Sequence, residues 1–314
     1  MAGSEQAVSD LHAMARLRAF EERVLELWVE KLVVGSVHLD IGQEAIPVGV
    51  ASVLRPEDAL FATYRGHGYA LAVGTPAEAL FAELLGRATG INGGRGGSAY
   101  LSAPDYGFYG ENSIVGAGAP IACGAALAGR YDGSGRVAVT VFGDGAMNQG
   151  SVHEAMNFAS AMRLPVVFIC VNNGWSELTP IADMVADPEL HKRAAAYAMP
   201  GRRIDGNDPA VVRAAMSEAV ELARSGQGPA LIEAVTQRLV GHYIGDAEVY
   251  RRPGELDQAK AREPLVVLGE RLAAAGIEPQ PIIDRAREEI EEAAAAALAA
   301  PLASPETAKE HVYA

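Results

Sequence analysis

The hydrophobic pattern predicts a long helix near each end of the chain. Residues 7–33 place apolar side chains at helical spacing, and Gly35 is a suitable residue to end that helix. One buried stripe can be built from five of these side chains: Leu11, Met14, Leu17, Leu25 and Trp28. Ile282–Ala299 is rich in Ala and Glu, which favours a second long helix.

Two short apolar runs in the middle of the chain predict buried parallel strands. Val137–Phe142 is rich in β-branched residues, and Pro165–Val171 has the same character. The segment between them, Asn148–Arg163, is expected to be a helix. A strand, a helix and a strand within about 35 residues form a βαβ unit.

Further elements extend this pattern towards the C-terminus. Pro209–Ser225 predicts a helix with Asp208 as its N-cap, and Ala230–Val235 predicts a third apolar strand. Residues 238–256 are polar with weak periodicity, which indicates a loop. Residues 86–150 are dense in glycine, which suggests backbone lying close to a ligand.

Together these elements predict an α/β fold with a mostly parallel sheet flanked by helices. We find no internal repeat and no linker rich in Pro, Gly or Ser. We therefore expect one domain spanning residues 1–314, with an N-terminal helix in residues 1–35 and a C-terminal helical extension in residues 257–314.

Composition and charge narrow the class of protein. Among 314 residues, 40 are acidic and 26 basic, giving a formal net charge of −14. This charge argues against nucleic acid and against an anionic membrane surface as partners. No apolar run approaches the length of a membrane span, and no basic N-terminal signal is evident. Cys123 and Cys170 are expected to be buried thiols, and the protein to be cytoplasmic.

Polar residues follow the two central strands at the point where each strand ends. The first is followed by Gly143-Asp144-Gly145 and the second by Asn172-Asn173, with Asn173 placed 29 residues after Asp144. If the strands are neighbours, both side chains lie at the same sheet edge. Carboxylate and amide oxygens suit Mg²⁺, and the amides of Gly145 and Ala146 can face an anion. Each motif alone is also typical of a tight turn, but the spacing favours a metal-bridged phosphate site.

Together with other motifs, this spacing resembles that of a known family. A Gly-Asp-Gly motif, 26 intervening residues and an Asn pair form the thiamine-diphosphate motif. Over about residues 16–260 the chain resembles the α subunit of the thiamine-diphosphate-dependent dehydrogenase component of 2-oxo acid and acetoin dehydrogenase complexes. The other motifs that carry the resemblance are His38–Ala45, Thr63–Gly68, Gly94–Ser98, Ile114–Gly118 and Gly143–Gly150.

The resemblance implies a thiamine-diphosphate-binding fold and a set of site residues. Asp144, Asn173 and the carbonyl of Trp175 would hold Mg²⁺. His38 and His242 would lie near the reacting carbon, and His67 close behind them. The remaining cofactor-binding positions are Tyr64, Arg65, Ile114, Val115, Gly145 and Ala146, with His242 also beside the cofactor.

The resemblance also implies partners. The family activates the cofactor with a Glu of a β subunit, forms an α₂β₂ tetramer and passes the product to a lipoyl-bearing acyltransferase core. We expect the α chain alone to be inactive.

The substrate is less clearly indicated. Arg238–Asp246 followed by Tyr250-Arg251 resembles acetoin-type members, and Tyr243 stands where pyruvate-type members carry a Ser after Gly-His. Acetoin is therefore preferred, with pyruvate or a branched-chain 2-oxo acid as the alternative. Two departures from the family pattern are Trp175-Ser176-Glu177-Leu178 and Tyr100, where a His is frequent.

Other interpretations remain for some residues and for the whole chain. His38, His242 and the Tyr64-Arg65 pair could be ordinary loop residues; His153 is expected to be structural, and His12, His191 and His311 receive no role. A non-catalytic relative that keeps the fold is an alternative. A nicotinamide-dependent oxidoreductase is disfavoured, because the Gly116–Ile121 segment lacks the third glycine of the fingerprint.

Overall fold

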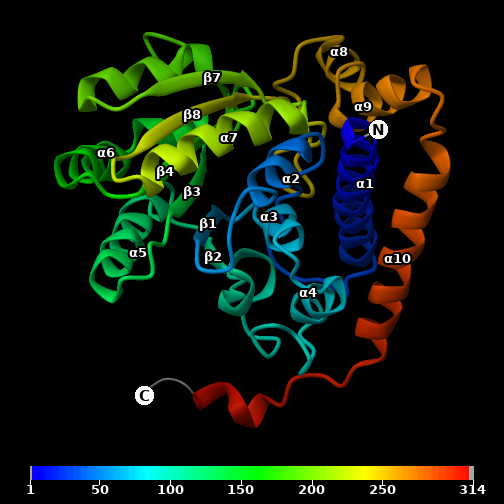
Figure 1. Cartoon of the computed structure of the whole chain (residues 1–314). Coiled ribbons are helices and arrows are strands. Elements are labelled where there is room, and N and C mark those ends of the chain that lie inside the picture. The colour runs from blue at the N-terminus through cyan, green and yellow to red at the C-terminus, as the bar shows by residue number, and fades with distance from the viewer. Residues whose placement is uncertain (1, 311–314) are drawn as a thin grey trace.

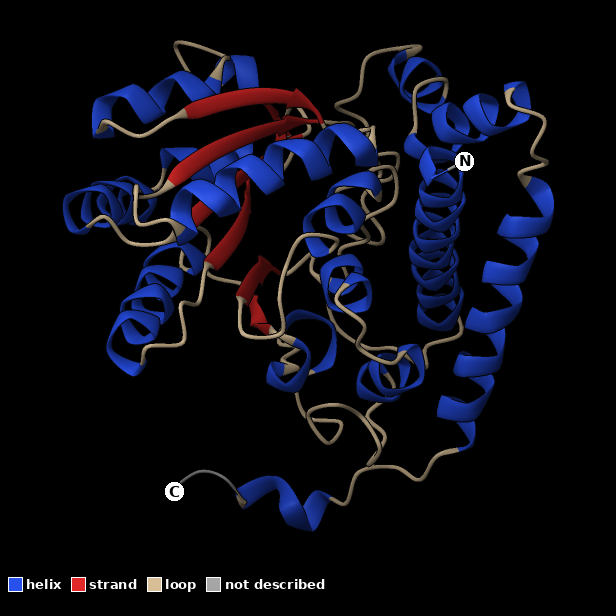
Figure 2. Cartoon of the chain, viewed as in Figure 1, coloured by secondary structure: helices blue, strands red, loops and turns tan. Residues whose placement is uncertain are grey.

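A computed structural model describes residues 2–310 of the chain. Within these residues, six strands form a sheet in the order β2-β1-β3-β4-β8-β7, and every neighbouring pair is parallel (Figure 2). The strands are β1 (Ala59–Thr63), β2 (Phe108–Asn112), β3 (Ala138–Gly143), β4 (Val166–Asn172), β7 (Gly201–Asp205) and β8 (Ala230–Val235). A separate antiparallel pair is formed by β5 (Trp175–Ser176) and β6 (Thr179–Pro180).

Helices cover both faces of this sheet (Figure 1). Along the strands, alternate side chains enter two apolar cores, so Val139 and Val141 face one side while Ala138 and Phe142 face the other. The helices are α1 (Ala2–Val29), α2 (Ala45–Ala51), α3 (His67–Ala72), α4 (Ala77–Leu84), α5 (Gly118–Asp132), α6 (Gly150–Met162), α7 (Pro209–Arg224), α8 (Glu255–Lys260), α9 (Pro264–Ala274) and α10 (Gln280–Ala299).

The two faces are covered differently. Helices α5 and α6 pack in one core, whereas α7 and α2 pack together in the other. Beyond the second core, α10 lies against α1 and α4, and the long α1 and α10 run side by side at the edge of the molecule (Figure 1). The mostly parallel sheet flanked by helices is confirmed.

Most predicted elements are present, with shifted ends. Strands β3, β4 and β8 and helix α7 lie where the apolar runs predict them, and the Asp208 side chain caps α7 by accepting the Ala210 N–H at 2.9 Å. The helix predicted for Asn148–Arg163 is divided: a 3₁₀ helix covers Asp144–Asn148, and α6 begins at Gly150 after an extended Gln149.

The first helix differs from its prediction at both ends. It begins at Ala2 and ends at Val29, because Lys31 adopts a left-handed conformation that closes the last turn, so Gly35 does not end it. Leu11, Met14 and Leu17 are buried as predicted. The buried stripe continues through Phe20, Val24 and Leu27, whereas Leu25 and Trp28 are only partly buried.

The structure also describes the two cysteines, the loop after β8 and the character of the helices. Cys123 and Cys170 are buried free thiols, as predicted. Residues 238–254 contain no helix or strand, in agreement with the predicted loop, and α8 begins at Glu255. None of the helices within residues 2–310 has the length and apolar character needed to cross a membrane.

Candidate active site

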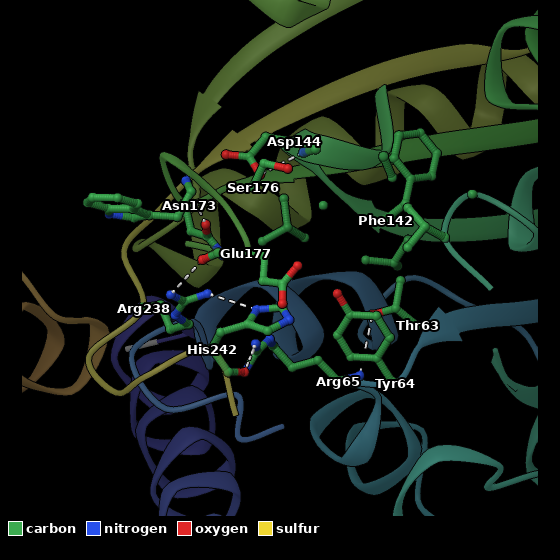
Figure 3. Close-up of a pocket in the computed structure, with 18 of the residues that line it drawn as sticks. Thr63, Tyr64, Arg65, Phe142, Asp144, Asn173, Ser176, Glu177, Arg238 and His242 are labelled. Carbon is green, nitrogen blue, oxygen red and sulfur yellow. Dashed lines mark hydrogen bonds between the residues drawn. The ribbon is translucent and has the colours of Figure 1, made fainter. Parts of the chain in front are cut away.

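A pocket of about 310 Å³ opens where β1, β3 and β4 end (Figure 3). Tyr64 follows β1, Asp144 follows β3 and Asn173 follows β4, and all three line the pocket. Because β3 pairs in parallel with both β1 and β4, their carboxyl ends meet at one edge. The prediction that Asp144 and Asn173 share this edge is confirmed.

Asp144 is a buried carboxylate, and no cationic side chain within residues 2–310 forms a salt bridge with it. Its side chain is 1% exposed, and its oxygens accept the N–H of Gly145 at 2.9 Å and of Gly174 at 3.0 Å. Burial raises the pKa of Asp144 to about 6, although these two hydrogen bonds act in the opposite direction. A divalent cation beside this carboxylate would offset its desolvation.

The loop after β4 is folded around Asp144. Asn173 accepts the Trp175 N–H at 3.1 Å through its amide oxygen and donates to the Gln43 side chain at 3.0 Å. Asn172 accepts the same Gly174 N–H that contacts Asp144, and it donates to the fully buried Glu233 at 2.7 Å. These bonds fix the main chain that carries Asn173 and Trp175.

Gly145 leaves room for a close approach in the pocket. A Cβ at this position would collide with the Ser176 side chain, so the glycine lets the β5–β6 hairpin lie against the end of β3. Within the described residues, no group of three or more His, Cys, Asp or Glu side chains gathers as a metal site. Asp144, Asn173 and Trp175 line the same pocket, and carboxylate, amide and carbonyl oxygens of such residues suit Mg²⁺ completed by phosphate oxygens. The residues present therefore fit a metal-bound diphosphate.

Arg65 joins the two loops that border the pocket. Its guanidinium donates to the carbonyl of Leu39 and, at 2.8 Å, to the carbonyl of His242. Arg65 is 9% exposed and lines the pocket beside Tyr64. The buried guanidinium supplies a fixed positive charge where the resemblance implies a diphosphate contact.

His38 and His242 meet beside Tyr64. The ring centroids of His38 and Tyr64 are 4.3 Å apart, and those of His38 and His242 are 5.0 Å apart. Burial, assisted by the charge of Arg65, lowers the pKa of His38 to about 3 and that of His242 to about 4. Both imidazoles are therefore neutral at neutral pH. His242 lines the pocket, whereas His38 lies behind it in contact with the other two rings.

Arg238 is a pocket residue to which the sequence interpretation gave no role. It lies shortly after β8, is 1% exposed and donates to His242 Nδ1 at 3.2 Å and to the Tyr250 hydroxyl at 2.8 Å. Because a guanidinium only donates, Nδ1 of His242 accepts and its proton lies on Nε2. Its position shortly after a parallel strand places it near the sheet edge, but no sequence pattern shows that its side chain turns into the pocket.

Of the other residues that the resemblance places in the site, some line the pocket and others do not. His67 does not line the pocket; it is fully buried, 2.9 Å from Glu21 and 2.9 Å from the Ser98 hydroxyl. Val115, Ala146 and Trp175 line the pocket, but Ile114 does not and is 70% exposed.

The other described histidines and Tyr100 lie outside the pocket lining. His153 contacts the Tyr197 hydroxyl, His12 contacts Glu289, and His191 pairs with Glu233. Tyr100 is 60% exposed. His311 lies outside the described residues.

Comparison with known proteins decides the family. The model of the family described as "Dehydrogenase E1 component" matches residues 12–306. The chain belongs to this family. Membership implies dependence on thiamine diphosphate, and the E1 α subunits of the family pair with β subunits.

Curated relatives include subunits with two different substrates in their names. The chain is 44% identical to the α subunit of acetoin:2,6-dichlorophenolindophenol oxidoreductase of Bacillus subtilis, over 80% of this chain and 75% of the relative. It is 39% identical to the subunit of that name from Cupriavidus necator, over 96% and 92%. It is 38% identical to the pyruvate dehydrogenase E1 component subunit alpha of Zymomonas mobilis, over 97% and 88%.

Proposed function

We propose that this chain is the α subunit of a thiamine-diphosphate- and Mg²⁺-dependent dehydrogenase that cleaves acetoin. The observation that carries the proposal is the pocket that joins Asp144, Asn173, Arg65 and His242 at one edge of the sheet. Family membership and the two acetoin-oxidoreductase relatives support it.

In this proposal the end of β3 and the loop after β4 hold the metal and the diphosphate. Asp144, the Asn173 amide oxygen and the Trp175 carbonyl would bind Mg²⁺, which the buried Asp144 carboxylate favours. Gly145 and Ala146 would present main-chain amides to the phosphates, and Tyr64 and Arg65 would contact them from the opposite side. When bound, thiamine diphosphate supplies the electron sink for breaking the bond next to the substrate carbonyl.

The histidines would manage protons next to the substrate. His242 presents a neutral Nε2–H, because Arg238 occupies Nδ1. That N–H can donate a hydrogen bond to a substrate oxygen without adding a positive charge to a site already containing two guanidinium groups. His38 would restrict the orientation of the His242 ring through their edge-to-face contact. His67 lies too deep to contact a ligand in the pocket, so we propose that it supports α3 behind Arg65.

The site is proposed to be completed by a β subunit. Such a partner would contribute the Glu that activates the cofactor, and an α₂β₂ tetramer would pass the product to a lipoyl-bearing acyltransferase core. Tyr243 in place of Ser, together with the named relatives, supports acetoin. Pyruvate is the second candidate, because a pyruvate dehydrogenase subunit is 38% identical over nearly the whole chain.

The test is turnover of the chain co-expressed with a β subunit of the same family. Thiamine diphosphate, Mg²⁺ and an artificial electron acceptor are supplied, and acetoin, pyruvate and branched-chain 2-oxo acids are compared. We expect acetoin cleavage by the α–β assembly and none by the α chain alone. Preference for a 2-oxo acid would overturn the substrate, and activity of the isolated α chain would overturn the shared site.

A further inference from the structure

Glu177 occupies a backbone position that is unfavourable for a glutamate. It begins the two-residue connection between β5 and β6 and has a φ of +56°. Left-handed conformations of this kind cost a residue with a Cβ about 1 kcal/mol, and glycine or asparagine is the usual occupant. The hairpin explains the conformation but does not explain the choice of a carboxylate there.

The carboxylate of Glu177 points into the pocket. Figure 3 shows it directed towards the ring of His242 and the hydroxyl of Tyr64, and Glu177 is among the lining residues. Its negative charge contributes to raising the pKa of Tyr64, after the larger effect of burial, which places the two groups within electrostatic reach. The hairpin is fixed here from two sides, because Ser176 packs on Gly145 and Arg238 donates to the Glu177 carbonyl at 3.3 Å.

The two cations among the described residues that line the pocket donate their hydrogen bonds to neutral groups. Among the described lining residues these are Arg65 and Arg238. Arg65 donates to two main-chain carbonyls. Arg238 donates to the carbonyls of Val240 and Glu177, to the Tyr250 hydroxyl and to His242. In these hydrogen bonds, neither guanidinium donates to the carboxylate of Glu177. The negative charge of that carboxylate faces the space where a substrate would lie.

From this arrangement we propose that Glu177 is a specificity-determining residue that favours an uncharged hydroxyketone over a 2-oxo acid anion. The inference rests on the proposed function of the pocket. An anionic substrate beside His242 would bring its carboxylate near that of Glu177, and the two like charges repel. An uncharged substrate such as acetoin avoids this repulsion, and its hydroxyl can donate to the Glu177 carboxylate. Glu177 therefore discriminates by repelling the 2-oxo acid anion as well as by attracting the uncharged hydroxyketone.

The experiment uses the α–β assembly carrying Glu177→Gln, which keeps the shape of the side chain and removes its charge. We expect kcat/KM for pyruvate to rise about tenfold while kcat/KM for acetoin changes by less than about threefold. Glu177→Asp keeps the charge and is expected to keep the wild-type substrate ratio. Asp183→Asn, an exposed charge removal in the neighbouring 3₁₀ turn outside the pocket lining, is the matched control.

A binding measurement separates this inference from the proposed function. Oxamate, an unreactive anion shaped like pyruvate, is titrated calorimetrically into the assembly without thiamine diphosphate, and we expect about tenfold tighter binding to Glu177→Gln. An unchanged substrate ratio and unchanged oxamate affinity in an active enzyme would overturn the role of Glu177 alone. Equal loss of both activities would also overturn it, because Glu177 would then serve the reaction itself. A wild-type assembly inactive with every substrate, yet with the expected oxamate shift, would overturn the proposed function and leave the anion exclusion standing.

Discussion

His38 and His242 illustrate how single residues in this pocket derive their properties from burial and from fixed charge. Both lie beside Tyr64, close to the buried guanidinium groups of Arg65 and Arg238. Protonating either imidazole would place a further positive charge in a partly desolvated site. As a neutral ring, His242 can donate a hydrogen bond to a substrate through Nε2–H without adding a charge to the pocket.

This environment predicts that neither ring titrates near neutral pH. Because the pKa is lowered to about 3 for His38 and about 4 for His242, both ring signals should stay in the neutral form from pH 8 down to about pH 5. Nuclear magnetic resonance of the histidine rings checks this, with signals assigned by their loss in His38→Gln and His242→Gln. A midpoint near the ordinary value of 6.5 for either signal would contradict the proposed electrostatics.

At the residue scale, part of the site could be predicted from the sequence. The positions of Asp144 and Asn173 could be predicted because each residue directly follows an apolar strand, and parallel strands end at a common edge. The position of the Arg238 side chain and the direction of Glu177 could not be predicted. Arg238 enters the pocket through a loop stabilised by Tyr250 and Asp246, and no periodic pattern encodes that geometry. The exposed position of Ile114 likewise depends on how the chain enters α5.

At the scale of elements, a buried ion pair connects α1 to α3. Glu21 on α1 contacts His67 at the start of α3, and both side chains are at most 1% exposed. Although burial alone would lower it, the Glu21 carboxylate and nearby acidic groups raise the pKa of His67 to about 9. The adjacent Arg65 and Tyr64 enter the pocket from the segment just before α3, so this pair anchors the segment that carries them.

The ion pair predicts a specific pH dependence of stability. His67 has a folded-state pKa of about 9 against about 6.5 when unfolded, so its stabilising contribution is complete below pH 6.5 and disappears as the pH rises to 9. Compared with His67→Gln, the wild-type protein should lose up to about 1.4 kcal/mol more unfolding free energy per pH unit in this window. Chemical denaturation at several pH values measures the difference.

Glu21→Gln provides the control for that measurement. It keeps His67 but removes the carboxylate that holds its proton, so the additional loss of stability above pH 6.5 should disappear as it does in His67→Gln. Parallel pH profiles for the wild-type protein and both variants would contradict a protonated His67 in the folded chain.

The sheet shows which elements the sequence pattern reveals. The central strands β3, β4 and β8 are buried on both faces and therefore form continuous apolar runs. The edge strands were missed: β7 carries two arginines and an exposed burial pattern, and β2 lies in the glycine-rich region. Strand β1 is apolar but only five residues long, which periodicity alone does not distinguish from a turn of helix.

At the scale of the whole molecule, the sheet, the hairpin over the pocket and the loop after β8 combine into one half of a proposed α–β active site. The family match over residues 12–306 supports this interpretation, and the relatives named for acetoin and for pyruvate differ little in identity to this chain. Overall sequence identity therefore does not decide which substrate is used, and the choice depends on the few residues that line the pocket. Among these, Glu177 gives the most direct physical basis for selection.

Asp144 is proposed to hold the metal through which thiamine diphosphate binds. The most direct test is calorimetric titration of thiamine diphosphate into the α–β assembly with Mg²⁺, with a chelator in its place, and with Asp144→Asn. We expect binding only with Mg²⁺ and at least about a hundredfold loss of affinity in Asp144→Asn, because the neutral amide cannot balance the cation. Asp183→Asn, outside the pocket lining, should bind like the wild-type protein. Equal affinity for Asp144→Asn, or binding unaffected by the chelator, would contradict a metal held by Asp144.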